Sequence, residues 1–123
     1  KLPFRQVHLD FHTSPAIAGI GTGFNKRQWQ EALKRGHVNS ITTFAVCHHG
    51  WSYYDTTVGK RHPGLDFDLL RAQYEASKEI GVNVPIYLTA GVNNRVADEH
   101  PERPMLTRYP PRNDRTCLQS FRR

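Results

Sequence analysis

Residues 4–13, "FRQVHLDFHT", alternate polar and apolar side chains with a period of two. This period predicts a β-strand, because successive side chains on a strand point to opposite faces. One face of the strand is apolar. The other face carries two imidazoles and a carboxylate, those of His8, Asp10 and His12. A buried strand with such a polar row needs a chemical explanation.

Two later segments have the spacing of amphipathic helices, residues 26–35 and residues 69–80. Each follows a residue type that caps helix N-termini, and the candidates are Asn25 for the first helix and Asp66 or Asp68 for the second. In the first helix Gln28 occupies the capping-box position. Glycines end both segments, at Gly36 and Gly81.

Two further strands are predicted over residues 39–49 and 83–92, which are rich in β-branched and aromatic residues. The resulting order is strand, helix, strand, helix, strand, and it repeats roughly every 40 residues, as consecutive βαβ units of a parallel sheet do. We therefore expect an α/β fold built from parallel βαβαβ units. The strands are mostly apolar, as expected when both faces of a sheet are covered. Residues 50–65 are expected to form a long loop.

Polar and aromatic side chains gather at the carboxyl ends of the predicted strands. They are Asp10, His12 and Thr13 at the end of the first, His48, His49, Trp51, Tyr53, Tyr54 and Asp55 after the second, and Tyr87, Thr89, Asn93 and Asn94 at the third. Ligands of parallel α/β folds bind at these ends. Aromatic rings beside hydrogen-bonding groups suit a sugar, which offers apolar C–H faces and a ring of hydroxyls. In contrast, we expect His37 and His62 to lie on the surface.

The net charge of +6 is concentrated near the end of the chain. Residues 100–123 hold six arginines against Glu102 and Asp114, which leaves +2 for residues 1–99. The basic residues therefore do not indicate a folded nucleic-acid-binding face, and we expect no nucleic-acid partner. Residues 100–123 also hold four of the eight prolines. We expect residues 1–99 to form the folded part, and 100–123 to be a disordered or foreign tail.

The two cysteines, Cys47 and Cys117, do not make a disulfide framework, and Cys47 is expected to be a buried thiol. No stretch has the apolar length of a membrane span and no signal-peptide pattern opens the chain. We therefore expect a cytoplasmic protein without a membrane partner. The chain begins with Lys1 rather than Met, so we expect either a piece cut from a longer reading frame or a processed chain.

The stretches "FAVCHHGWSYYDT" and "FDLLRAQYEASKEIGVNVPIYLTAG" resemble strands two and three of alpha-L-fucosidase-type glycoside hydrolases. Residues 4–100 as a whole are similar to an uncharacterised bacterial group of glycosyl hydrolases, related to alpha-amylase and beta-galactosidase-like (β/α)8 barrels. The resemblance implies the N-terminal portion of such a TIM barrel, which takes about 250 residues when complete. A chain of three strands then leaves sheet edges bare, so self-association through these edges is expected.

The resemblance also implies roles for individual residues. The implied sugar-binding residues are His12, His48, His49, Trp51 and Tyr54, whereas the family's nucleophile falls beyond this chain. Asp10 and Asp55 are the acidic residues near strand ends, and we do not expect them to form the catalytic carboxylate pair. The chain alone is therefore expected to be inactive. The fucosidase pattern has an Asp directly after the His pair, where this chain has Gly50 and Trp51, and the identity of the sugar stays open.

Two other classes of function remain open at this stage. A metal-dependent, amidohydrolase-like barrel would use imidazole and carboxylate ligands, and the residues that fit are His8, Asp10, His12 and His48. A small flavodoxin-like module would have no enzymatic activity, and an arginine-tailed nucleic-acid-binding protein is a further minor alternative. For the glycosidase interpretation we expect neither a metal nor another cofactor.

Overall fold

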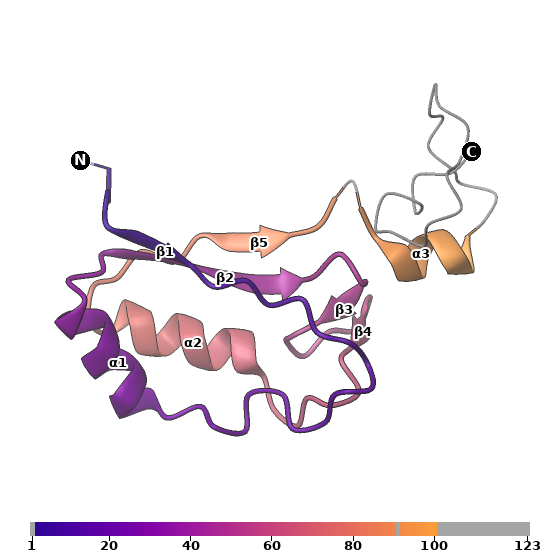
Figure 1. The fold of residues 1–123 in the computed structure, drawn as a ribbon, viewed down its shortest axis with the longest axis horizontal. Helices are drawn as coiled ribbons and strands as arrows, with labels where there is room; N and C mark the ends of the chain where they lie inside the picture. Colours follow the sequence, from indigo (N-terminus) through magenta and orange to yellow (C-terminus); the bar gives the residue numbers. More distant parts are fainter. Residues whose placement is uncertain (1, 91, 101–123) are drawn as a thin grey trace.

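Helices α1 (Lys26–Arg35) and α2 (Leu69–Lys78) lie on the same face of a mostly parallel, open β-sheet (Figure 1). The structure is a computed structural model, and it describes residues 2–90 and 92–100. The mixed α/β class predicted from the sequence is confirmed. Residues 101–123, where most of the predicted tail falls, lie outside the described residues.

Three parallel strands form the centre of the sheet. Strands β1 (Gln6–His8) and β5 (Ile86–Leu88) each pair in parallel with β2 (Ser40–Val46), on its two sides. The spatial order of the three strands thus follows their order in the chain. A flavodoxin-like sheet would instead place its first strand between the second and the third. This order therefore disagrees with the flavodoxin-like alternative.

The segment expected to be a loop contains two short strands, β3 (Trp51–Ser52) and β4 (Lys60–Arg61). Strand β3 pairs antiparallel with the end of β2, and β4 pairs in parallel with β3, so the sheet is not purely parallel. The reversal occurs in a turn closed by the Gly50 N–H, which donates to the Cys47 carbonyl at 2.8 Å. Gly50 has a φ of +86°, which glycine adopts without steric cost.

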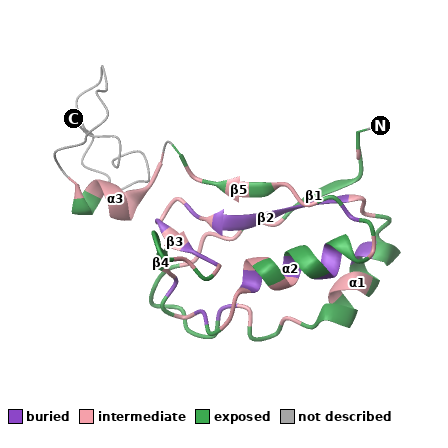
Figure 2. Ribbon diagram, turned by 180° about the vertical axis from the view of Figure 1, so that it is seen from behind, coloured by how far each residue is buried: buried purple, intermediate pink, exposed green. Residues whose placement is uncertain are grey.

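Burial is concentrated in β2, whose residues from Ser40 to Ala45 are all buried, whereas all three residues of β1 are exposed (Figure 2). The expectation that both faces of every strand are covered is therefore wrong for the outer strands. Their ladders are also shorter than predicted: residues 4–13 pair over Gln6–His8, and residues 83–92 pair over Ile86–Leu88. An outer strand has a partner on one side only, so fewer backbone bonds keep it regular.

Both predicted helices form, with the expected N-caps. The Asn25 side chain accepts the Gln28 N–H at 3.0 Å, and the Asp68 carboxylate accepts the Arg71 N–H at 2.8 Å, which decides between Asp66 and Asp68. Gly81 follows α2 with a φ of +73°. After α1, His37 rather than Gly36 takes the left-handed conformation, with a φ of 50°.

A third helix, α3 (Asn94–Glu99), was not predicted. Its N-cap is Asn93, whose side chain accepts the Val96 N–H at 3.0 Å. None of the helices in the described part of the chain is long and apolar enough to span a membrane.

The apolar core has two parts. Beneath the sheet, Ile41 of β2 packs with Leu33 of α1 and Val82 after α2. The second part lies near the loops at the carboxyl ends of the strands, and its buried members are Ile20, Phe44, Cys47, Tyr53, Leu65 and Leu69. Cys47 is fully buried, as predicted.

Ile41 tests the first part of the core, because its side chain is 1% exposed. We expect Ile41→Ala to lower the free energy of unfolding by about 2–5 kcal/mol, through lost burial and a residual cavity. Val58 is 97% exposed. Val58→Ala is the matched control and should change the stability by less than about 0.5 kcal/mol. Urea unfolding followed by circular dichroism measures both, and equal effects would contradict this account of the core.

Candidate functional site

Three imidazoles meet at the carboxyl ends of β1 and β2. The ring centroids of His12 and His48 are 3.9 Å apart, those of His48 and His49 4.1 Å, and those of His12 and His49 6.4 Å. The backbone N–H of His48 donates to His12 Nδ1 at 3.4 Å. Parallel pairing of the two strands produces this meeting, since both carboxyl ends fall at one edge of the sheet. We call His12, His48 and His49 the histidine cluster.

Aromatic rings from β2 and β5 adjoin this cluster. Phe44 and Tyr87 stack with their ring centroids 4.3 Å apart. The ring of His12 meets both edge-on, at 5.0 Å from Phe44 and 5.9 Å from Tyr87. His8 also meets both edge-on, at 5.4 and 6.3 Å. Hence His8 and His12 lie on the same face, as the alternating pattern predicted.

Asp10 lies beside the cluster and pairs with His12. The distance between Asp10 Oδ1 and His12 Nε2 is 3.1 Å, and the Asp10 side chain is 71% exposed, against 22% for His12. Because His12 Nδ1 accepts the His48 N–H, Nε2 carries the proton and donates to Asp10. Asp10 thus fixes the tautomer of His12.

The proposed metal-ligand set does not form a chelating group. Among residues 2–90 and 92–100, no three His, Cys, Asp or Glu side chains are placed to hold a metal ion together. His12 in addition uses Nδ1 to accept from the backbone and Nε2 to donate to Asp10. The geometry therefore does not support the amidohydrolase-like alternative for His8, Asp10, His12 and His48.

Burial lowers the pKa of His12, His48 and His49 below the ordinary value of 6.5. The neighbouring imidazoles lower these pKa values further, and the negative charge of Asp10 partly offsets the effect for His12 and His48. At neutral pH the three rings are therefore mostly uncharged; His48 and His49 each offer one donor and one acceptor, whereas both ring nitrogens of His12 already have partners. Among the described residues, no hydrogen bond engages the ring nitrogens of His48 or His49, so these remain available to a ligand.

Trp51 and the turn that precedes it are held by α3. The Arg95 guanidinium lies 5.9 Å from the centroid of the Trp51 ring, and its Nε donates to the Gly50 carbonyl at 3.0 Å. The Asn94 N–H donates to the His48 carbonyl at 2.8 Å. The half-buried Trp51 thus lies next to the histidine cluster in sequence and is packed from one side by α3.

The remaining predicted residues lie further along the same segment. Tyr54 is half-buried, and the Asp55 carboxylate, which is 65% exposed, pairs with Arg61 at 2.8 Å. Asp10 influences the pKa values of His12 and His48, whereas Asp55 does not. The structure therefore brings Asp10, but not Asp55, into contact with the histidine cluster.

His62 is not on the surface, contrary to the expectation from the sequence, because it is 1% exposed. Its Nε2 lies 3.0 Å from the Ser14 carbonyl, and its Nδ1 accepts the Gly64 N–H at 3.0 Å. The ring also stacks on buried Tyr53, with the centroids 5.8 Å apart. The following Pro63-Gly64 turn was the available signal, since such a turn folds the chain back on the preceding residue.

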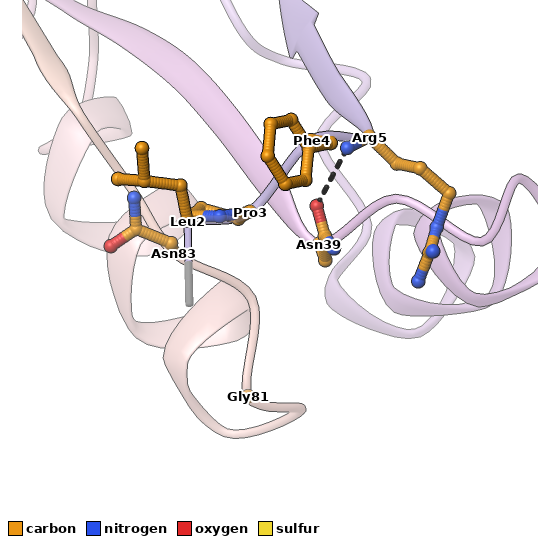
Figure 3. A pocket seen from close by; sticks show the side chains of 7 residues that line it. All are labelled: Leu2, Pro3, Phe4, Arg5, Asn39, Gly81 and Asn83. Carbon is orange, nitrogen blue, oxygen red and sulfur yellow. Dashed lines mark hydrogen bonds between the residues drawn. The ribbon is translucent and has the colours of Figure 1, made fainter.

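A cavity of about 740 Å³ opens at the other end of the sheet (Figure 3). Its lining includes Phe4, Arg5 and Asn39, and the Arg5 N–H donates to Asn39 Oδ1 at 3.0 Å. Asn39 directly precedes β2, whereas His48 follows it. This cavity is therefore remote from the carboxyl ends of the strands, where α/β folds bind their ligands.

The fold is mixed α/β with a mostly parallel open sheet, and comparison with known proteins defines the family. Residues 25–114 match the model of the family described as "Hypothetical glycosyl hydrolase 6". The chain belongs to this glycosyl hydrolase family. No curated protein matches the chain.

A solved structure adds a particular relative, alpha-L-fucosidase isoenzyme 2 from Paenibacillus thiaminolyticus. The two share 54% sequence identity with a TM-score of 0.83, over 87% of this chain and 16% of the fucosidase. The chain therefore spans about one sixth of the length of that relative. The resemblance to fucosidase-type glycosyl hydrolases stated from the sequence is confirmed.

The lowered pKa values predict how stability depends on pH. Unfolded imidazoles, with an ordinary pKa near 6.5, bind protons more readily than the folded ones. The contribution of the histidine cluster to the free energy of unfolding is therefore fully present above pH 6.5. It is lost as the pH falls through the lowered pKa values of the folded protein. We expect the free energy of unfolding to be smaller at about pH 5.5 than at about pH 7.5. In the double variant His48→Gln/His49→Gln this difference should shrink. If the double variant kept the same difference in unfolding free energy between the two pH values, the pH dependence would not come from the histidine cluster.

The close packing around Gly50 leads to a prediction about stability. A Cβ at this position would overlap Asn93 Oδ1 and lie 2.8 Å from Arg95 Cβ, in a backbone conformation with a φ of +86°. Gly50→Ala should therefore lower the free energy of unfolding by about 1–3 kcal/mol. At Gly23 a Cβ would meet nothing within 4 Å, so Gly23→Ala is the matched control. Thermal melts of the two variants check this, and equal melting temperatures would show that α3 does not pack on the turn in solution.

Proposed function

We propose that the histidine cluster forms one wall of the sugar-binding subsite of a fucosidase-like glycoside hydrolase, acting on an alpha-L-fucoside. The observation that carries the proposal is the meeting of three uncharged imidazoles beside Phe44 and Tyr87 at the carboxyl ends of parallel strands. The relationship to alpha-L-fucosidase isoenzyme 2 supports the choice of sugar.

The chemistry of the side chains suits a sugar. Uncharged imidazoles donate to one hydroxyl and accept from another, and the free ring nitrogens of His48 and His49 are the candidates for this role. His12, whose ring nitrogens have partners in Asp10 and the His48 N–H, would border the subsite from the adjacent strand end. Trp51 and Tyr54 would border the subsite, because both are half-buried and follow the histidine pair directly in the chain.

We further propose that this chain supplies the first strands of a (β/α)8 barrel. Three observations support this. The parallel strands β1, β2 and β5 lie in chain order, helices α1 and α2 lie on one face of the sheet, and the chain spans 16% of the fucosidase. Hydrolysis of a glycoside requires two carboxyl groups flanking the bond. In this proposal the nucleophile belongs to a strand outside the present chain, and Asp10 acts on His12 rather than on the glycosidic bond.

The exposed edges of the outer strands affect whether the isolated chain self-associates. Ile86 and Leu88 of β5 are 51% and 62% exposed, and β1 is exposed throughout. Exposed edges with apolar side chains favour pairing with further strands. In the absence of the rest of a barrel, we propose that the chain self-associates through these edges, which size-exclusion chromatography with light scattering measures directly.

We expect the purified chain to bind L-fucose without hydrolysing 4-nitrophenyl α-L-fucopyranoside. His48→Ala should weaken the binding at least about tenfold, because it removes a hydrogen-bonding ring. The matched control is His37→Asn, which removes a histidine beyond α1 and keeps a residue that tolerates the left-handed backbone. Isothermal titration calorimetry and release of nitrophenol are the measurements. Turnover that depends on His48 would show that the chain carries its own catalytic carboxylates.

A further inference from the structure

Two buried side chains hold the segment that directly follows His12. Tyr53 and His62 are each 1% exposed, and their rings stack with an interplanar angle of 19°. Neither belongs to the sugar-binding set proposed above. Full burial of a phenol and an imidazole is costly unless their polar atoms are hydrogen-bonded. Both side chains find their partners in the loop between β1 and α1.

The Tyr53 hydroxyl holds Thr13 at two atoms. It accepts the Thr13 backbone N–H at 3.2 Å and lies 2.7 Å from Thr13 Oγ1. The backbone of Tyr53 is itself fixed, because its N–H donates to the Ala45 carbonyl at 3.0 Å and its carbonyl accepts the Leu70 N–H at 3.0 Å. Thr13 is thereby tied to a residue that β2 and α2 hold in place.

His62 holds the next residue. Because its Nδ1 accepts the Gly64 N–H, Nε2 carries the proton and donates to the Ser14 carbonyl. The chain at Gly64 also approaches the loop so closely that a Cβ there would overlap the Ile17 carbonyl. Two successive residues after His12 are therefore fixed from beneath by side chains of one rigid stack.

The other contacts of His12 are weaker. Its partner Asp10 is 71% exposed, and the bond from the His48 N–H is long, at 3.4 Å. An exposed pair contributes little, since water screens it. The regular pairing of β1 ends at His8, with one further bond from the Leu9 N–H to the Thr42 carbonyl. The pairing of β1 brings His12 to the end of β2, and the contacts at Thr13 and Ser14 then fix where its ring lies against His48.

We propose that Tyr53 is a positioning residue that sets the His12 ring against His48, with His62 supporting the Tyr53 ring. The contact of His12 with a sugar rests on the proposed function, but the positioning itself does not. The test variant is Tyr53→Phe, which removes one oxygen and keeps the ring. Tyr74→Phe makes the same chemical change on α2, where the side chain is 42% exposed, and is the matched control.

Nuclear magnetic resonance of the ring protons provides a readout that a purely structural role would not move. With the fold retained by circular dichroism, Tyr53→Phe should weaken the nuclear Overhauser effect between His12 and His48. It should also raise the pKa of His12 toward its ordinary value, because the ring leaves its partly buried place. Tyr74→Phe should change neither. Unaltered His12 signals in folded Tyr53→Phe would overturn the proposal.

Variants of Thr13 test the same proposal independently, in case Tyr53→Phe does not fold. Thr13→Val removes the hydroxyl partner at nearly constant volume but keeps the backbone N–H bond, so it should change His12 in the same direction and by less than Tyr53→Phe, whereas Thr13→Ser keeps the oxygen and should preserve the wild-type signals. The double variant Tyr53→Phe/Thr13→Val should shift His12 no further than Tyr53→Phe alone, because Tyr53→Phe already removes both hydrogen bonds to Thr13. Additive shifts, or none in Thr13→Val, would overturn the proposal.

Titration with L-fucose separates this inference from the proposed function. If both hold, Tyr53→Phe weakens L-fucose binding roughly tenfold through displacement of His12. If the wild-type chain does not bind L-fucose, the proposed function fails, and the His12 signals still decide the positioning role.

Discussion

Strand β2 has a parallel neighbour on each side, and the geometry of the site depends on this pairing. Its register with β1 places Thr42 opposite His8, and its register with β5 places Phe44 opposite Tyr87. Residues 36 positions apart in the chain, His12 and His48, are therefore brought into contact by backbone bonds rather than by an attraction between their side chains. Protonated imidazoles at this distance would repel each other, so the backbone maintains an arrangement that the side chains would not form alone.

The uncharged state of the histidine cluster follows from the same packing. Phe44 and Tyr87 cover the His12 ring, the imidazoles of the cluster cover one another, and burial lowers the pKa values of all three. Asp10 is too exposed to reverse the effect, yet it is close enough to orient His12. The result is a surface that offers hydrogen bonds without net charge. Such a surface suits a neutral sugar better than a phosphate or a carboxylate ligand, which would require a cationic partner.

Local patterns were sufficient for the helices and for the class of the fold. Helix caps depend on nearby residues, so the sequence could predict Asn25 and reduce the second cap to Asp66 or Asp68, of which the structure shows Asp68. The same holds for the shared face of His8 and His12. Contacts between distant segments were not accessible in this way. The burial of His62 depends on the Ser14 carbonyl, 48 residues earlier, and the β2–β3 reversal depends on a left-handed Gly50 that α3 covers. No period along the chain encodes such contacts, so a histidine between Arg61 and Pro63 resembled a surface residue.

The distribution of exposed residues connects the fold to its proposed setting. Both helices cover one face of the sheet, while the face that bears Phe44, His8 and His12 has no helix over it among the described residues (Figure 1). In a doubly wound fold helices would cover both faces, whereas in a closed barrel the uncovered face becomes the packed interior. Closure also pairs the first strand with the last, which would occupy the outer edge of β1, and each later strand would continue from β5. The same closure would surround the histidine cluster with further strand ends, and these are the positions from which a barrel enzyme presents its catalytic carboxylates.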